Sequence, residues 1–274
     1  MTSFDLENPD HAYMFGFLQA DGHLRQGPGN KGSLSVELSA RDTPLLEEFK
    51  RICPWPSSIR HRTRTRTTNF AANHTSATWT VCAREFREQL VALGLPPGRK
   101  SSTVEPPRAP FSERDHLRGL IDADGSLGRT GKDLPFVSLT TASESLAAHF
   151  CRYAHALTGA VRTARRNRRD AIYNILFTGE DAVAVVRHLY YPGCLALPRK
   201  LAATADLTAW TRPDGMRKVL RRPWTADEDR LLLAARNAEA AAALLGRSVS
   251  SCAARRWRLV GPEKAGVRFP HTPA

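Results

Sequence analysis

Cysteine, acidic residues and long apolar runs are all scarce in this chain. Its 274 residues include five cysteines, none of them spaced as C-x-x-C, which argues against a disulfide framework or a cysteine zinc site and indicates reduced thiols. No apolar run approaches the roughly 18 residues that a transmembrane helix needs. Residues 1–20 contain no basic segment followed by an apolar one, so we expect no secretory signal, no membrane partner and a cytoplasmic location.

Acidic residues are outnumbered by basic ones, 27 to 40, which leaves a net charge of +13 and a pI of about 10.1. A charge of this size predicts a polyanionic partner. A membrane surface would be bound by a basic amphipathic helix, which the sequence does not contain, so nucleic acid is the favoured partner. The chain length suits two or three units of about 100 residues each.

Two copies of one short pattern, 103 residues apart, stand out in the sequence. Residues 14–22 (MFGFLQADG) and 117–125 (LRGLIDADG) are each an apolar helical stretch that ends in Asp-Gly. Each has small residues four apart, namely Gly16 and Ala20 in the first copy and Gly119 and Ala123 in the second. Such residues share a helix face and let a partner backbone approach closely. We therefore expect the two helices to pack through these faces.

Packing of this kind would place Asp21 beside Asp124 at two helix C-termini. A carboxylate at that end of a helix opposes the helix dipole, and two adjacent like charges are unfavourable unless a cation lies between them. Mg²⁺ suits a site with so few acids, because it keeps several waters and takes only one or two carboxylates from the protein. The pair therefore predicts a divalent metal site.

The second pattern resembles the signature of the LAGLIDADG homing endonucleases at eight of nine positions, with Arg118 as the exception. The first pattern resembles it at four positions, Gly16, Ala20, Asp21 and Gly22. Two copies in register imply a single-chain protein with two related halves.

The resemblance implies roles for individual residues. Asp21 and Asp124 are expected to be catalytic metal ligands, and the backbone carbonyls of Ala20 and Ala123 to complete the protein side of a Mg²⁺ site, with Mn²⁺ as the alternative ion. Asp122 aligns with a glutamine in the first copy. That mismatch argues against a metal role and favours a polar residue at the interface between the helices.

Two lysines, Lys100 and Lys200, follow their aspartates Asp21 and Asp124 by 79 and 76 residues. They match the position of a family lysine that reaches toward the cleavage centre, where it would polarise the attacking water or neutralise the scissile phosphate. A solvated lysine or a plain phosphate contact is the alternative. The preceding arginines, Arg99 and Arg199, are alternates for the same role.

Each pattern heads a longer repeat, in which an alternating segment predicts a strand at 33–38 and at 136–140. An apolar helix, a basic hairpin and a closing helix follow in both copies. The hairpins are expected at 59–68 with 77–82 and at 161–169 with 171–178, and the closing helices at 86–93 and 181–190. A Pro/Gly turn then ends in Arg-Lys, at 96–100 and at 197–200.

The resemblance implies an α+β fold of two pseudo-symmetric αββαββα halves that pack through the motif helices as a monomeric pseudo-dimer. We expect the halves to span 1–103 and 114–205. A proline-rich connector at 104–113 would join them, and residues 206–222 form a basic, turn-prone linker.

Residues 223–262 follow a different pattern, which predicts a small all-α domain of three helices. Thr225 and Glu228 form a capping box, the second helix is nearly all Ala and Leu, and Ser248 is placed to cap the third. Residues 224–229 (WTADED) and 245–248 (LGRS) resemble the Myb/SANT-like family, although the second helix lacks the family's middle tryptophan. The resemblance implies a helix-turn-helix that contacts DNA. A three-helix appendage that only stabilises the fold is the alternative.

The third helix of this domain is expected to carry Val249, Cys252 and Leu259 on one side. The other side is expected to present arginines to DNA, namely Arg247, Arg255, Arg256 and Arg258.

The clearest candidate for DNA recognition lies at residues 60–67, where arginine alternates with histidine or threonine. On a strand, Arg60, Arg62, Arg64 and Arg66 share one face. A two-stranded ribbon fits the DNA major groove, where arginine pairs with guanine, and phosphate contact is the less specific use of the same residues. A solvated charged face is the alternative. The counterpart in the second half comprises Arg162, Arg165, Arg166, Arg168 and Arg169.

These features together predict a site-specific double-strand DNA endonuclease of the homing type. It would hydrolyse phosphodiester bonds at an asymmetric target with a divalent metal, as the product of an intron-encoded or free-standing mobile gene. Two alternatives use the same fold, a non-cleaving DNA-binding transcriptional regulator and a maturase that binds intron RNA.

Overall fold

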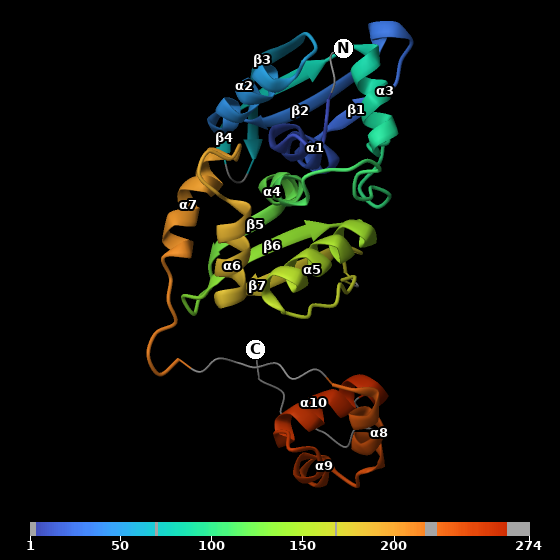
Figure 1. The fold of residues 1–274 in the computed structure, drawn as a ribbon, viewed down its shortest axis with the longest axis vertical. Helices are drawn as coiled ribbons and strands as arrows, with labels where there is room; N and C mark the ends of the chain where they lie inside the picture. Colours follow the sequence, from blue (N-terminus) through green and yellow to red (C-terminus); the bar gives the residue numbers. More distant parts are fainter. Residues whose placement is uncertain (1–3, 69–70, 168, 217–223, 262–274) are drawn as a thin grey trace. The chain divides into compact units, whose positions relative to one another are not determined.

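The computed structural model describes residues 4–68, 71–167, 169–216 and 224–261, with the backbone alone for 64–68 and 71–74. The chain divides into two compact units, Met1–Asp214 and Gly215–Ala274, and each is considered by itself (Figure 1). No helix within the described ranges is both long and apolar enough to cross a membrane.

The first half of the larger unit begins with helix α1 (Pro9–Asp21). The side chain of Asn8 accepts hydrogen bonds from two amides of the first turn, and proline occupies the first helical position. The elements that follow are β1 (His23–Arg25), β2 (Ser33–Ser39), α2 (Thr43–Ile52), β3 (Ser57–Thr68), β4 (Ala71–Val81) and α3 (Arg84–Leu93). The strands form an antiparallel sheet in the order β1-β2-β4-β3.

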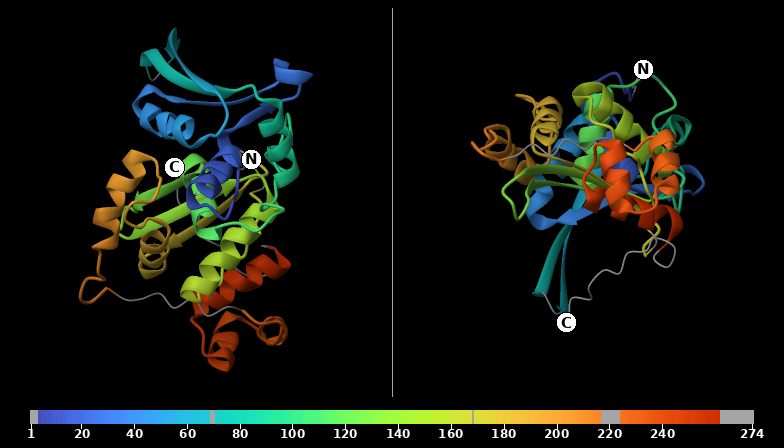
Figure 2. Two further views of the ribbon diagram at one scale, coloured as in Figure 1. Left: turned by 45° about the horizontal axis from the view of Figure 1, so that its top comes forward. Right: turned by 90° about the horizontal axis from the view of Figure 1, so that it is seen from below.

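Apolar and polar residues alternate along the strands, so one face of the sheet is apolar and is buried by the helices. Leu34 and Val36 of β2 and Trp79 of β4 are completely or almost completely buried, and they belong to one core with Phe49 of α2 and Phe86 of α3. The β3–β4 hairpin extends beyond the rest of the sheet (Figure 2).

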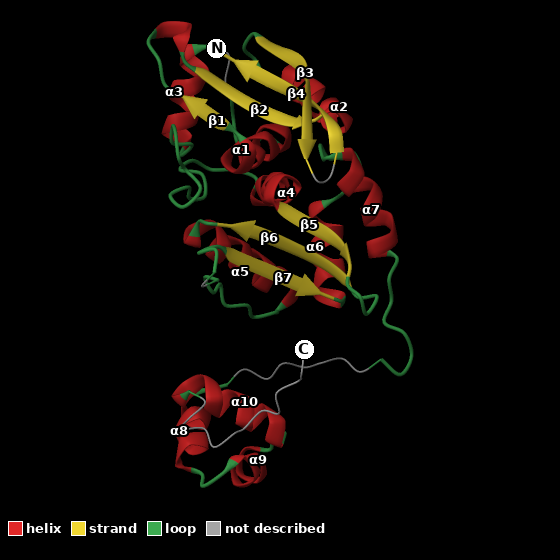
Figure 3. Cartoon of the chain, turned by 180° about the vertical axis from the view of Figure 1, so that it is seen from behind, coloured by secondary structure: helices red, strands yellow, loops and turns green. Residues whose placement is uncertain are grey.

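The second half contains α4 (Glu113–Asp124), β5 (Gly125–Arg129), β6 (Pro135–Thr141), α5 (Glu144–Thr158), β7 (Tyr173–Thr178), α6 (Glu180–Leu189) and α7 (Pro198–Thr208). Its three strands form an antiparallel sheet in the order β5-β6-β7. Helices α5 and α6 cover the core face. Helices α1 and α4 lie side by side between the two sheets (Figure 3).

The strand expected at 161–169 is not formed, and this part of the prediction is wrong. The described residues of the segment make one isolated bridge, between Arg166 and Tyr173, and the chain turns where Ala171 N donates to Asn167 O. Val161 is 61% exposed, and the segment offers little else but arginine. A further strand would therefore gain little apolar burial.

Two boundaries in the second half also differ from those expected. The turn predicted at 197–200 is the start of α7, with Pro198 at its first position, and the linker expected from residue 206 is helical up to Thr208. Proline is well tolerated at that position of a helix because its missing N–H has no helical partner there. Lys200 is therefore held on a helix, whereas Lys100 is not.

The smaller unit consists of α8 (Ala226–Ala234), α9 (Ala238–Leu245) and α10 (Val249–Val260). The capping box of Thr225 and Glu228 is present, and Ser248 caps α10 by accepting from Ser251 N. Cys252 is completely buried, but Val249 and Leu259 are 43% and 39% exposed. These two side chains lie outside the core, because helices this short enclose only a few side chains.

Candidate active site at the paired helix ends

Helices α1 and α4 meet backbone to backbone at two glycines. A Cβ atom on Gly16 would lie 2.1 Å from the carbonyl oxygen of His116, and one on Gly119 would lie 2.1 Å from that of Tyr13. No side chain fits into such a space. The predicted packing through small faces is therefore confirmed at these two positions.

Asp122 lies inside this contact, as expected for an interface residue. Its carboxylate accepts hydrogen bonds from Tyr13 Oη at 2.7 Å, Tyr190 Oη at 2.6 Å and Leu197 N at 2.6 Å. Burial raises the pKa of Asp122, although the three donors oppose that shift by stabilising the charged form. Asp122 thus ties α4 to α1 and to the segment before α7.

Arg118, the one departure from the motif in the second copy, is completely buried. Its Nη1 lies 2.6 Å from the Asp115 carboxylate, and the guanidinium also donates to the carbonyls of Leu195 and Leu189 at 2.8 and 2.9 Å. The only sign of this ion pair in the sequence is the i, i+3 spacing of two charged residues.

The acidic pair lies where α1 and α4 end. Asp21 and Asp124 are the last residues of the two helices, and both remain accessible to solvent. Burial of the carboxylates by neighbouring groups raises the pKa of both, and for Asp124 the nearby charge of Asp21 adds to burial and raises its pKa to about 6. The two acids expected to meet are therefore electrostatically coupled.

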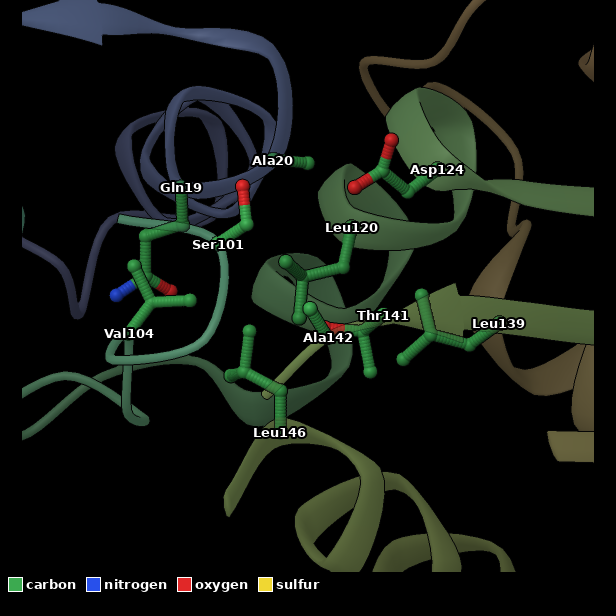
Figure 4. Close-up of a pocket in the computed structure, with 10 residues that line it drawn as sticks. All are labelled: Gln19, Ala20, Ser101, Val104, Leu120, Asp124, Leu139, Thr141, Ala142 and Leu146. Atoms are coloured by element: carbon green, nitrogen blue, oxygen red, sulfur yellow. The ribbon is translucent and has the colours of Figure 1, made fainter. Parts of the chain in front are cut away.

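A small pocket adjoins this pair. Asp124 lines it together with Ala20 from the end of α1 and Ser101 from the loop that follows Lys100. Figure 4 shows the Asp124 carboxylate near these two residues, with Leu120 and Leu139 forming an apolar wall. Residues from both halves, including the Asp124 carboxylate, thus line one small volume beside the helix ends.

Both lysines lie beneath the acidic pair and are only 7% and 6% exposed. Lys100 Nζ donates to Ala20 O at 2.8 Å, whereas Lys200 Nζ donates to the carbonyls of Ile121, Asp122 and Gly125 at 2.5, 2.9 and 2.7 Å. They therefore neutralise the negative ends of α1 and α4.

Burial lowers the pKa of Lys100, and lowers that of Lys200 to about 8. The charges of Asp21 and Asp124 act in the opposite direction on both lysines, and the two lysines in turn lower the pKa of each acid. The four side chains thus form one electrostatic cluster.

The two alternates for the lysine role differ in their surroundings. Arg199 Nε lies 3.4 Å from the Asp42 carboxylate, so it links α7 to the N-terminal end of α2. Arg99 is exposed.

The donor set around Asp21 and Asp124 fits a hard divalent cation such as Mg²⁺. It consists of two carboxylates and main-chain oxygens, of which Ala20 O already accepts a hydrogen bond from Lys100. Within the part of the chain that the structure describes, no three His, Cys, Asp or Glu residues are grouped to hold a metal. An ion at this site would therefore retain several water ligands.

The arginines expected to bind DNA fall into two groups. Those that are exposed, with no partner within the described residues, are Arg60, Arg62, Arg165 and Arg258. Those in the second group make contacts inside the protein. Four form ion pairs, namely Arg162 with Asp181, Arg169 with Asp170, Arg247 with Glu228 and Arg255 with Asp229. Three donate hydrogen bonds to main-chain carbonyls, namely Arg162 to Leu176, Arg166 to Ala171 and Arg256 to Ala235. Arg168 and the side chains of Arg64 and Arg66 lie outside the described residues.

Residues 112–189 match the LAGLIDADG-like domain. The match begins at the N-cap of α4, includes the second motif, and runs to the end of α6. No curated protein matches the sequence.

Several solved structures are similar to this one. The homing endonuclease I-WcaI bound to its DNA recognition sequence aligns with a TM-score of 0.51 and 12% identity, over 73% of this chain and 87% of that one. A mesophilic variant of the homing endonuclease I-DmoI aligns at 0.47 and 16%, over 74% and 100%. The N-terminal LAGLIDADG domain of DUF199/WhiA aligns at 0.44 and 13%, over 77% and 86%.

At these identities the likeness concerns the fold. The larger unit shares its arrangement of helices and antiparallel sheets with I-WcaI, and the match to the LAGLIDADG-like domain covers residues 112–189.

Proposed function

We propose that the protein is a site-specific double-strand DNA endonuclease of the homing type that depends on a divalent metal and acts as a monomer. The observation that carries this proposal is the close approach of α1 and α4, in which Gly16 and Gly119 each lie against the backbone of the other helix. This approach brings the helix ends together, so that the charge of Asp21 affects the pKa of Asp124. A protein has little other reason to hold two carboxylates at two adjoining negative helix ends.

The residues of the site have separate tasks in this proposal. Asp21 and Asp124 would hold the ion together with main-chain oxygens, and the bound ion would activate water and stabilise the charge that develops on the phosphate. Lys100 and Lys200 keep the two acids ionised and fix the helix ends through their hydrogen bonds to main-chain carbonyls.

The DNA would lie on the sheet faces that point away from the core, where Arg60 and Arg62 are exposed. The net charge of +13 favours that association at long range. The DNA-bound state of I-WcaI, which shares the fold, supports the same partner. The three helices of the smaller unit would add contacts outside the core target as a helix-turn-helix, through Arg258 on α10.

A second candidate is a DNA-binding regulator that does not cleave. It is favoured by the hydrogen bonds of Lys100 and Lys200, whose ammonium groups are engaged with main-chain carbonyls rather than directed at the acidic pair.

One experiment separates the candidates. The protein is incubated with a randomised duplex library and Mg²⁺, and the new DNA ends are sequenced. An endonuclease gives enriched ends at one asymmetric site. A regulator enriches a bound sequence without new ends, and a maturase binds its intron RNA in preference to any duplex in the library.

The acidic pair gives the first prediction. Asp21→Asn and Asp124→Asn should each lower the cleavage rate at the selected site by at least about 10²-fold, because loss of one charged group that stabilises the transition state typically has an effect of this size. Binding to the same duplex without added metal should be unchanged or tighter, because a negative charge near DNA is removed.

The matched control is Asp133→Asn, an exposed acid at the β5–β6 turn whose positive φ asparagine tolerates. It should cleave normally. Normal cleavage by Asp21→Asn would show that the catalytic site has been misplaced.

A further inference from the structure

The outer faces of the two sheets, which point away from the apolar core, differ in chemistry. The outer face of the first sheet carries Arg25 on β1 and Arg60 and Arg62 on β3, all exposed. Register places Arg60 opposite Thr78 and Arg62 opposite Ser76. Small hydroxyl side chains thus surround the long cationic ones, together with the Glu37 carboxylate of β2, which lies opposite Thr78 and accepts a hydrogen bond from Ser76 Oγ at 2.7 Å. Arg25 Nη2 donates a hydrogen bond to Lys31 O at 3.1 Å, and the other N–H groups of its guanidinium have no partner within the described residues.

The outer face of the second sheet has an apolar centre instead. Leu176 of β7 is 45% exposed although its neighbours Ile175 and Phe177 are buried in the core. Phe136 of β6 lies on the same face. Its ring covers Gly128 of β5 so closely that a Cβ atom there would be 3.2 Å from the ring. Phe136 packs against neither core cluster.

Small polar groups complete this second face. Ser138 lies opposite both Ser126 and Leu176, and Asn174 of β7 lies opposite Thr140. Asn174 is exposed and its amide has no hydrogen-bond partner within the described residues. The face therefore offers one free amide, several hydroxyls and two apolar side chains.

The nearest cations in the second half do not alter this chemistry. Arg129 at the end of β5 is paired with Asp206 at 2.7 Å and Asp133 at 3.1 Å. Arg162 and Arg166 belong to the segment beside the edge strand β7, and both make contacts inside the protein. These three arginines are thus engaged within the protein and do not lie free on the outer face of the sheet.

We propose that the two sheets recognise half-sites of different base composition, and this inference rests on the proposed function. The first sheet recognises guanine, because an arginine fork pairs with the O6 and N7 acceptors of that base. The second sheet recognises A·T pairs, because Leu176 and Phe136 would contact the thymine methyl group while Asn174 bonds the N6 and N7 edge of adenine. The target would have a G-containing half and an A·T-rich half.

The test uses the wild-type protein and modified DNA, so that protein folding cannot confuse the result. A target is first selected from a randomised duplex library by binding in Ca²⁺. Thymine is then replaced by uracil, which removes only the methyl group, or guanine by 7-deazaguanine, which removes only the N7 acceptor. The replacements are made in one half-site at a time.

Uracil should weaken binding about fourfold for each contacted methyl group, and only in one half-site. The guanine analogue should weaken binding roughly fivefold or more for each arginine contact, and only in the other half-site. Equal sensitivity of both halves to either analogue would overturn the inference. Failure to select any duplex would instead overturn the proposed function.

Two variants assign each half-site to its sheet. Leu176→Ser should reduce the effect of uracil, because only Phe136 remains to contact a methyl group, and Arg60→Ala should reduce the effect of the guanine analogue. The controls are Leu157→Ser and Arg84→Ala, an exposed leucine and an exposed arginine on helices α5 and α3, outside both outer faces. Both controls should keep the wild-type response. If Leu176→Ser and Arg60→Ala change the same half-site, the assignment is wrong.

Discussion

At the ends of α1 and α4, the two lysines are buried and the two acids are accessible to solvent. Lys100 and Lys200 are buried but bonded to carbonyls, whereas Asp21 and Asp124 remain open to solvent and close to each other. An approaching cation therefore meets the two acids first. The buried lysines lie behind the acids and limit the repulsion between them.

This arrangement makes stability depend on pH in a defined direction. The pKa of Asp124 is raised to about 6 in the folded protein, mainly by burial, and is about 3.9 in an unfolded chain. Between these values the folded state binds more protons, so the free energy of unfolding falls as pH rises from about 4 to 6. Solvent screening keeps this contribution on the order of 1 kcal/mol or less.

Thermal melting in the presence of a chelator checks this prediction. The melting temperature of the wild type minus that of Asp124→Asn should decrease between about pH 4 and pH 6 and stay constant above. Addition of Mg²⁺ at pH 7 should stabilise the wild type more than the variant. A difference that increases across the same pH range would contradict the raised pKa.

Most tertiary contacts that could not be predicted from the sequence are ion pairs or hydrogen bonds between two individual residues. Arg118 was visible only as a mismatch to the motif, yet it forms a buried ion pair with Asp115. Gln19, the counterpart of Asp122, bonds His116 Nε2 at 2.7 Å and Glu105 O at 2.8 Å. Such partners are brought together by the fold and leave no local periodicity.

At the scale of elements, the contact of α1 with α4 depends on two missing side chains. Gly119→Ala would place a Cβ atom 2.1 Å from Tyr13 O and 2.8 Å from Phe17 N. The helices must then separate, which should destabilise the fold by about 1–3 kcal/mol or more and move the acids apart. Denaturant unfolding measures the first effect, and cleavage of the selected site the second.

Gly131→Ala is the control for that change. Gly131 has no neighbouring atom within 4 Å of a Cβ atom and no positive φ. The control should unfold at the wild-type denaturant concentration. Wild-type stability of Gly119→Ala would mean that the helices are not held at this distance.

Elements were predictable where a long-range repeat supported a local pattern. The strands at 33–38 and 136–140 and the closing helices at 86–93 and 181–190 lie within one or two residues of β2, β6, α3 and α6. The failures have a common cause, namely local signals that do not report burial. The basic segment at 161–169 was matched to the hairpin of the first half but has no apolar face and forms no strand, and a proline predicted a turn where it begins α7.

At the scale of the whole molecule, the count of 40 lysines and arginines overstates the number of cationic side chains that are free to contact DNA. Arg247 and Arg255 of the smaller unit are paired with Glu228 and Asp229 and contact the Trp224 ring at 4.1 and 5.9 Å. They hold its helices together. Arg255 lies on the basic third helix as expected, whereas Arg247 lies just before it. The internal role of both arginines could not be predicted, because their acidic partners lie 19 and 26 residues away along the chain.

The salt dependence of DNA affinity measures how many cationic side chains contact phosphates. Each phosphate contact contributes about 0.9 to the slope of log affinity against log salt concentration. Arg165→Ala and Arg258→Ala should therefore each reduce the magnitude of that slope by about one, because both side chains are exposed and have no partner within the described residues. Arg230→Ala should leave it unchanged, because that exposed arginine is already paired with Asp227. An unaltered slope for Arg258→Ala would show that α10 does not approach the DNA through this residue.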